Sequence, residues 1–188
     1  MKILVIDNYD SFTYNLVHCV KKFSDAAVDV FRNDQISIEA AGNYDKIIIS
    51  PGPGLPADAG IILPLIKRYA SSRSIMGVCL GMQAVTEAFG GTLLNPGTVY
   101  HGISLPVNIK VRDVIFDGIP DRFMAGRYHS WAADTTSLPS CFDIIAEDNN
   151  GIIMALSHKT FDVKGVQFHP ESILTEYGDL LVRNWIRS

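Results

Sequence analysis

The chain has 188 residues, of which 47% are hydrophobic and 19% charged, and its formal net charge is −4. This length and balance predict one globular domain over residues 1–188, with a core large enough to need no metal or disulfide. The slight negative charge provides no basic field, which argues against nucleic-acid binding.

Strand and helix patterns alternate through the first half of the chain. Apolar runs predict buried strands over residues 2–6, 27–32, 46–50 and 74–78, and helices are predicted over residues 11–23, 59–69 and 82–89. Pro64 either bends the second helix or marks its true start. Such alternation predicts an α/β fold with a mostly parallel central sheet and helices on both faces.

The second half is rich in strands. Residues 103–111 alternate between apolar and polar, which predicts a half-exposed strand, and Pro106 places that strand near an edge of the sheet. Further strands are predicted over residues 142–146, 151–157 and 163–168, and a final helix over 175–187.

Three loops follow strands of the predicted parallel sheet, namely Asp7 and Asn8, residues 50–54 (SPGPG), and Cys79. Ligands of such sheets bind beyond the carboxyl ends of the strands. On its own, the Pro-Gly repeat is typical of a plain turn. After a buried strand, its glycines also let the backbone approach a ligand closely, so the Gly52 N–H is a candidate oxyanion donor.

Cys79 lies in residues 77–81 (GVCLG), between a predicted strand and a predicted helix. A glycine two positions away on either side is what a tight strand-to-helix elbow needs. At the helix N-terminus, backbone N–H groups favour a thiolate, and the Leu80 N–H points toward an oxyanion on an attacked carbonyl. The alternative is an inert core cysteine, which is what we expect of Cys19 and Cys141.

His169 and Glu171 follow the strand-like residues 164–168 and are two positions apart. If the strand continues, both side chains project from one face, where a carboxylate can orient an imidazole base. With Cys79, they complete a nucleophilic triad by residue type. Taken alone, His169 fits a buried core histidine equally well.

Residues 50–54, 77–83 and 165–172 resemble the three signature blocks of class I (triad-type) glutamine amidotransferases. Residues 7–15 and 127–130 narrow the resemblance to component II of anthranilate synthase and of aminodeoxychorismate synthase. The resemblance runs from the third residue to the end of the chain, and it implies a flavodoxin-like fold.

The resemblance implies that Cys79 attacks the glutamine side-chain amide, that His169 relays protons, and that Glu171 orients His169. Gly52 and Leu80 would form the oxyanion hole. The positions that match the family's glutamine-binding residues are Gly52, Pro53, Gly54, Gln83, Ser130 and Trp131. Met82 and Trp131 depart from the His and Leu of many relatives, which indicates a tuned pocket or interface rather than lost activity.

The resemblance also implies a partner. Ammonia released from L-glutamine would pass to a chorismate-binding component I subunit in a hetero-oligomer, for anthranilate formation in tryptophan biosynthesis. The length of the chain agrees with this expectation, because it leaves no room for an acceptor-binding domain of its own. No metal or cofactor is expected in this chain, and the partner is expected to use Mg²⁺. Three cysteines without a CxxC spacing, and no signal peptide or membrane-spanning stretch, predict a cytoplasmic protein.

Several alternatives remain open at this stage. One is component II of aminodeoxychorismate synthase, in folate biosynthesis, or a subunit shared by both enzymes. Others are a noncatalytic regulatory subunit and a freestanding cysteine hydrolase such as a peptidase. Residues 7–13 are either a helix N-cap through Asp10 or Ser11, or a partner contact with Tyr9 and Phe12 as exposed anchors.

Overall fold

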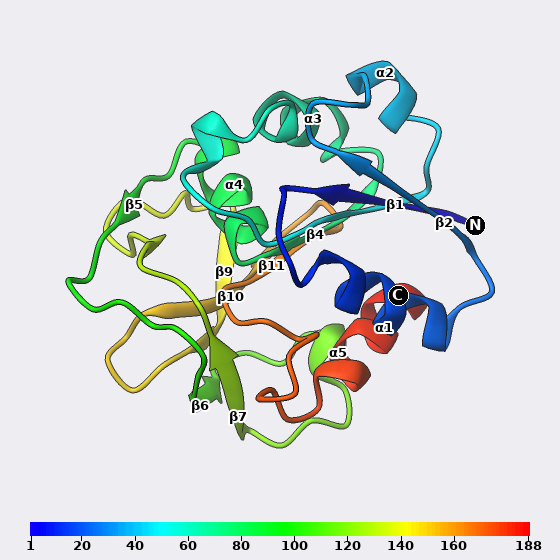
Figure 1. Cartoon of the computed structure of the whole chain (residues 1–188). Helices are drawn as coiled ribbons and strands as arrows, with labels where there is room; N and C mark the ends of the chain where they lie inside the picture. The colour runs from blue at the N-terminus through cyan, green and yellow to red at the C-terminus, as the bar shows by residue number, and fades with distance from the viewer.

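The computed structural model describes residues 1–188, and its strands form a nine-stranded sheet together with a separate two-stranded one (Figure 1). The large sheet has the order β2-β1-β3-β4-β11-β10-β9-β6-β7, and the small sheet pairs β5 with β8. The strands are β1 (Lys2–Asp7), β2 (Ala27–Arg32), β3 (Lys46–Ile49), β4 (Ser74–Val78), β5 (Leu93–Leu94), β6 (Ile103–Ile109), β7 (Arg122–Arg127), β8 (Ala132–Ala133), β9 (Phe142–Glu147), β10 (Ile153–His158) and β11 (Val163–Val166).

Five α-helices and two 3₁₀ turns connect these strands. They are α1 (Thr13–Phe23), α2 (Ile38–Ala41), η1 (Pro56–Asp58), α3 (Ile62–Tyr69), α4 (Leu80–Ala88), η2 (Val114–Phe116) and α5 (Gly178–Arg187). None of the helices has the length and apolar character needed to cross a membrane.

The large sheet changes character halfway across. From β2 to β11 every neighbouring pair is parallel, whereas from β11 to β7 every pair is antiparallel. The predicted α/β fold, with a parallel sheet followed by a strand-rich second half, is confirmed. The parallel strands read as continuous apolar runs because helices cover both of their faces.

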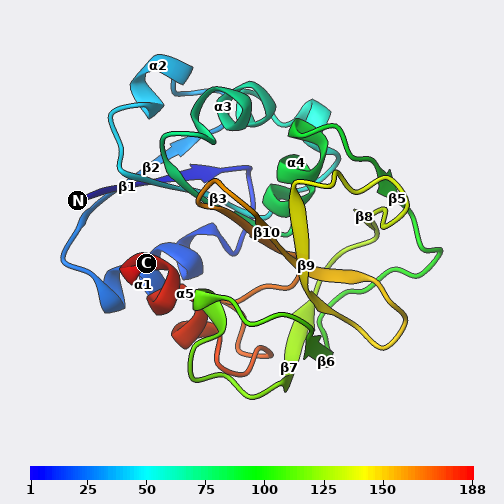
Figure 2. The ribbon, with the colours of Figure 1, turned by 180° about the vertical axis from the view of Figure 1, so that it is seen from behind.

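Two apolar cores lie on opposite faces of the parallel half. In β1, Ile3 and Val5 join the core beneath α1 and α5, whereas Leu4 and Ile6 join the core beneath α3 and α4. Figures 1 and 2 show these helix pairs on the two sides of the sheet. Burying each of these side chains stabilises the fold by about 1.5–3 kcal/mol. Residues of β1 alternate between the cores because successive side chains of a strand point to opposite faces.

Several boundaries differ from the sequence prediction. The helix expected from residue 59 begins at Ile62, with Pro64 in its first turn, where the N–H that proline lacks has no helical partner anyway. The last helix begins only at Gly178, because Tyr177 has a left-handed φ of 58°. Pro106 lies near the sheet edge as predicted, because β6 is next to the outermost strand β7 and β9 reaches β6 only at Asn108 and Ile109. The edge strand β7 was not predicted.

Candidate active site

Cys79 lies on a sharp turn between β4 and α4, with φ of 53° and ψ of −104°. This conformation is strained for a residue with a side chain. A Cβ on Gly77 would lie 2.4 Å from the Gly81 carbonyl carbon, and a Cβ on Gly81 would lie 2.3 Å from the Ile49 oxygen. Both positions therefore accept only glycine, as the elbow prediction required.

Backbone hydrogen bonds hold the elbow on both sides. The Cys79 N–H donates to the Val166 oxygen of β11 at 2.8 Å, and the Cys79 oxygen accepts from the Gln83 N–H at 3.1 Å. Leu80 is the first residue of α4, so its N–H has no acceptor within the helix. The sulfur is thus next to the positive end of a helix dipole.

His169 and Glu171 form a buried pair. The His169 Nδ1 is 2.7 Å from Glu171 Oε1, and the two side chains are 2% and 0% exposed. Burial alone would lower the pKa of His169, but its neighbours Cys79 and Glu171 raise it to about 10. The position of His169 between the Cys79 and Glu171 side chains therefore favours a proton on the imidazole.

From the sequence, His169 and Glu171 were expected to pair because they share one face of a strand, and this reason is wrong. The strand ends at Val166, so His169 and Glu171 belong to the following loop and not to a strand face. In that loop the His169 N–H donates to the Gly126 oxygen of β7 at 3.1 Å, and the His169 oxygen accepts from Thr175 Oγ1 at 2.6 Å. The loop is therefore attached to the edge of the sheet, and these bonds fix the imidazole.

A cavity of about 150 Å³ opens beside Cys79. Its wall includes all six residues matched to glutamine binding, Gly52, Pro53, Gly54, Gln83, Ser130 and Trp131, together with Cys79, Tyr128 and His129. A larger hollow of about 580 Å³ lies between β2 and α2, but no cysteine or histidine lines it. Of these two cavities, only the smaller one is lined by Cys79.

Gly52 and Leu80, the two candidate oxyanion donors, are neighbours. A Cβ on Gly52 would lie 2.8 Å from Leu80 Cδ2 and 2.5 Å from the Asn8 Cβ. Glycine at this position therefore lets the residue 50–54 loop pack against the first turn of α4. The Asn8 side chain also holds this loop by donating to the Ser50 oxygen at 2.8 Å.

The loop after β7 forms the opposite wall. The Trp131 oxygen accepts from Gln83 Nε2 at 2.9 Å, and it lies 3.0 Å from His129 Nδ1. A carbonyl only accepts, so the Nδ1 of His129 carries the proton. Burial lowers the pKa of His129 to about 4, against the opposing effect of the Trp131 hydrogen bond. His129 is therefore a neutral, structural donor.

A second cavity, of about 480 Å³, reaches Cys79 from the side of His169. Phe12 and Tyr128 line it and pack on the imidazole, with ring centroids 5.4 and 4.8 Å from that of His169. Sequence reasoning gave neither residue this role. Phe12 is half-buried, so it is not the exposed anchor that was expected, whereas Tyr9 is 48% exposed.

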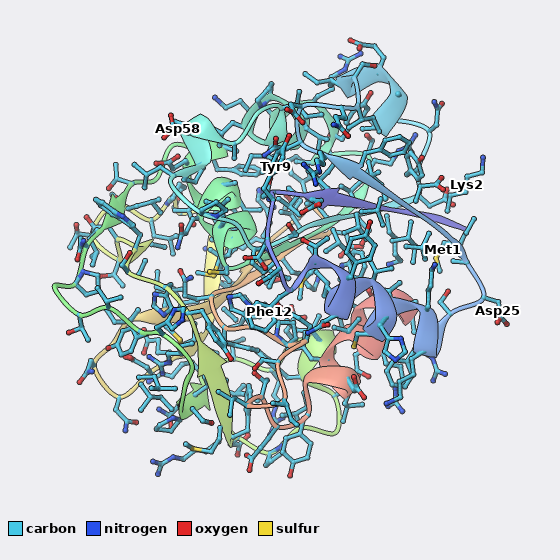
Figure 3. The ribbon with its side chains drawn as sticks, in the orientation of Figure 1. Met1, Lys2, Tyr9, Phe12, Asp25 and Asp58 are labelled. Carbon is cyan, nitrogen blue, oxygen red and sulfur yellow. The ribbon has the colours of Figure 1, made fainter.

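The loop between β1 and α1 carries both Tyr9 and Phe12, which Figure 3 labels. Asp10 Oδ1 accepts from the Phe12 N–H at 2.8 Å, but Phe12 is the N-cap residue of α1 and no side chain caps the helix, so the expected N-cap through Asp10 or Ser11 is wrong. Ser11 is exposed. The Tyr9 hydroxyl donates to Asp34 and its ring lies 4.4 Å from the Arg32 guanidinium, which holds the exposed ring in place.

The remaining cysteines lie apart from these cavities. Cys19 is buried among apolar side chains, and burial together with Asp179 raises the pKa of its thiol far above the ordinary range. Cys141 is half-buried, and all three cysteines are free. No group of three or more His, Cys, Asp or Glu side chains is arranged to hold a metal ion.

Comparison with known proteins gives one consistent result. A family model described as glutamine amidotransferase class-I matches residues 4–188. The chain is 44% identical over 189 residues to anthranilate synthase component 2 of Azospirillum brasilense, covering 99% of this chain and 95% of that protein. It is 43% identical over 188 residues to aminodeoxychorismate/anthranilate synthase component 2 of Bacillus subtilis strain 168, covering 99% and 96%. The crystal structure of a glutamine amidotransferase from Thermotoga maritima aligns with a TM-score of 0.76 at 14% identity, covering 91% of this chain and 76% of that one, and it supports the fold alone.

Proposed function

This chain belongs to the glutamine amidotransferase class-I family, and on that premise we propose that it is the glutamine-hydrolysing subunit of anthranilate synthase. The observation that carries the proposal is Cys79 on its strained elbow, at the mouth of a cavity that all six expected glutamine-binding residues line. The alternative partner is aminodeoxychorismate synthase, because a relative from Bacillus subtilis is named for both enzymes.

The reaction begins when the Cys79 thiolate attacks the side-chain amide carbon of glutamine. A C–S bond forms, and the amide oxygen becomes an oxyanion that the Gly52 and Leu80 N–H groups stabilise. Losing one such donor costs roughly 3 to 4 kcal/mol in a comparable acyl-transfer site. Because an amide is a poor electrophile, the thiolate alone does not suffice.

The C–N bond breaks when His169 donates its proton to the leaving nitrogen, which departs as ammonia. The elevated pKa of His169 supports this role, since the ring is protonated at neutral pH. Water then attacks the glutamyl thioester while His169 accepts a proton, and glutamate leaves with regeneration of the thiolate. Glu171 holds the imidazole through Nδ1 in every step.

We further propose that the ammonia is used by a chorismate-binding component I subunit in a cytoplasmic complex. The relatives are named as components of such synthases, and free thiols suit a reducing compartment. No step assigned to this chain needs a cofactor, and Mg²⁺ belongs to the partner in this scheme.

The test mixes the purified chain with a component I subunit and supplies either glutamine or ammonium salt. Cys79→Ser is expected to abolish glutamine-dependent anthranilate formation and to leave ammonia-dependent formation intact. Cys141→Ser, at a half-buried thiol outside both cavities, is the matched control and should retain both activities. Unchanged glutamine-dependent anthranilate formation with Cys79→Ser would contradict the mechanism and favour a noncatalytic regulatory subunit.

Two further comparisons separate the remaining alternatives. The first mixes the chain with component I of aminodeoxychorismate synthase in place of component I of anthranilate synthase. The component I subunit that forms product from glutamine identifies the pathway. Rapid turnover of peptide substrates without any partner would favour a freestanding cysteine hydrolase instead.

A further inference from the structure

A chain of three side-chain hydrogen bonds runs from the wall of the glutamine cavity to the nucleophile. Gln83 Nε2 donates to the Trp131 oxygen at 2.9 Å and to Gln167 Oε1 at 3.3 Å. Gln167 Nε2 then donates to the Cys79 sulfur at 3.5 Å. The sulfur therefore has a direct amide donor that belongs to neither the triad nor the proposed oxyanion hole.

Only one orientation of the Gln83 and Gln167 side-chain amides satisfies all three hydrogen bonds. The Trp131 carbonyl can only accept, so the Gln83 atom that faces it must be the nitrogen. The same nitrogen faces Gln167, so Gln167 must present its oxygen there, which leaves its NH₂ group toward Cys79. The direction of the donor to sulfur thus follows from a backbone carbonyl and not from an arbitrary choice of amide orientation.

Gln167 is placed with little freedom. The residue is 0% exposed and directly follows β11, and its own N–H donates to the Met154 oxygen of β10 at 2.8 Å. By contrast, His169 Nε2 is buried and has no hydrogen-bond partner in this structure. Gln167 Nε2 is the one side-chain atom that hydrogen-bonds the sulfur here.

The geometry points to Gln167 as a further catalytic residue, whose amide N–H holds the Cys79 sulfur in its charged form and aims it at the glutamine carbon. Gln83 acts as the positioning residue that keeps Gln167 in the donating orientation. This inference rests on the proposed function in one respect, the role of Cys79 as nucleophile.

The physical reason is that a hydrogen bond donated to an ionised group favours that form over the neutral one. The three hydrogen bonds also link glutamine binding to the reactivity of the Cys79 thiol, since Gln83 and Trp131 both line the glutamine cavity. A substrate that orders Trp131 therefore orders the donor to the sulfur as well.

The test is the pH dependence of Cys79 alkylation by iodoacetamide, followed by mass spectrometry of the peptide that contains Cys79. Gln167→Met keeps the length of the side chain but removes the donor. We expect the midpoint of the alkylation curve to rise by about one pH unit, and alkylation at neutral pH to slow about tenfold. Gln35→Met, the same change at an exposed residue, should leave the curve unchanged.

A second variant keeps the test decisive if Gln167→Met does not fold. Gln83→Met frees the Gln167 amide to turn, and it should move the midpoint in the same direction by less. A folded Gln167→Met chain with the wild-type midpoint would overturn the inference, as would a wild-type midpoint in Gln83→Met if only that variant folds. A merely structural Gln167 would lower the melting temperature without moving the midpoint. The assay uses no glutamine and no partner subunit, so its outcome is separate from that of the proposed function.

Discussion

Replacing Glu171 by glutamine removes the charge that faces the His169 ring while it keeps the shape of the side chain. Burial alone would lower the pKa of His169, and Cys79 and Glu171 together raise it from 6.5 to about 10. A hydrogen bond to a charged group contributes about 1.5–3 kcal/mol, which corresponds to about one to two pKa units. We therefore expect Glu171→Gln to lower this pKa by that amount and to slow glutamine-dependent turnover about 10- to 100-fold.

The same substitution changes how stability depends on pH. Because folding raises the pKa of His169, its contribution to stability is fully present below about pH 6.5 and is lost as the pH rises through about 10. Glu171→Gln should therefore lower the free energy of unfolding by about 1.5–3 kcal/mol at pH 6, and by progressively less as the pH approaches 10.

Two measurements check this reasoning. NMR titration of the ring carbons in histidine-labelled protein follows the pKa of His169, and urea unfolding at pH 6 and pH 10 follows the stability. Glu39→Gln, at an exposed glutamate of α2, is the matched control and should change neither. An unchanged His169 titration in Glu171→Gln, or an equal loss of stability at both pH values, would refute the role of the charge.

Other expectations follow from contacts elsewhere. Gly81→Ala has no space for its Cβ, which would lie 2.3 Å from the Ile49 oxygen, so thermal unfolding should show a loss of about 3 kcal/mol or more; wild-type stability would contradict this. Arg127→Met leaves the buried Asp148 carboxylate without its partner at 2.7 Å, which should cost about 3–5 kcal/mol in urea unfolding, and adding Asp148→Leu should recover part of it. Burial lowers the pKa of His129 to about 4, so stability should fall on acidification from pH 6.5 toward 4, and His129→Gln should remove up to about 3 kcal/mol of that loss. An acid-unfolding curve with the wild-type slope in His129→Gln would count against a buried neutral ring.

The elbow could be predicted from sequence because its requirements are local. Gly77 is needed because Gly81 and Met82 of the same turn leave no space for a Cβ, whereas Gly81 faces the Ile49 oxygen of β3 and was indicated by the glycine spacing of the elbow motif. The parallel strands could be predicted for a similar reason, since burial on both faces requires continuous apolar runs. Gly52 is different, because its close neighbours Asn8 and Leu80 are distant in sequence, and only the motif indicated it.

The features that could not be predicted depend on contacts between residues that are distant in sequence. The strand expected over residues 163–168 ends at Val166, because the chain there leaves β4 and bonds instead to Gly126 of β7. The pattern of apolar residues in the sequence does not indicate this change of hydrogen-bond partner. The contact of Gln167 with sulfur likewise requires knowing where Cys79 and Gln83 lie relative to β11.

The two halves of the sheet supply different parts of the site. The nucleophile belongs to the parallel half, where the backbone of β3 and β4 leaves the elbow no freedom. The cavity wall and the base both depend on β7, since this strand continues into residues 128–131 and its Gly126 binds the His169 loop through the His169 N–H and Thr175 Oγ1. A displacement of β7 therefore moves substrate and base together relative to a stationary sulfur. Binding and proton transfer are therefore coupled through one edge strand, and because the Trp131 oxygen orients Gln83 and through it the Gln167 amide at the sulfur, the donor to the thiol depends on the same strand.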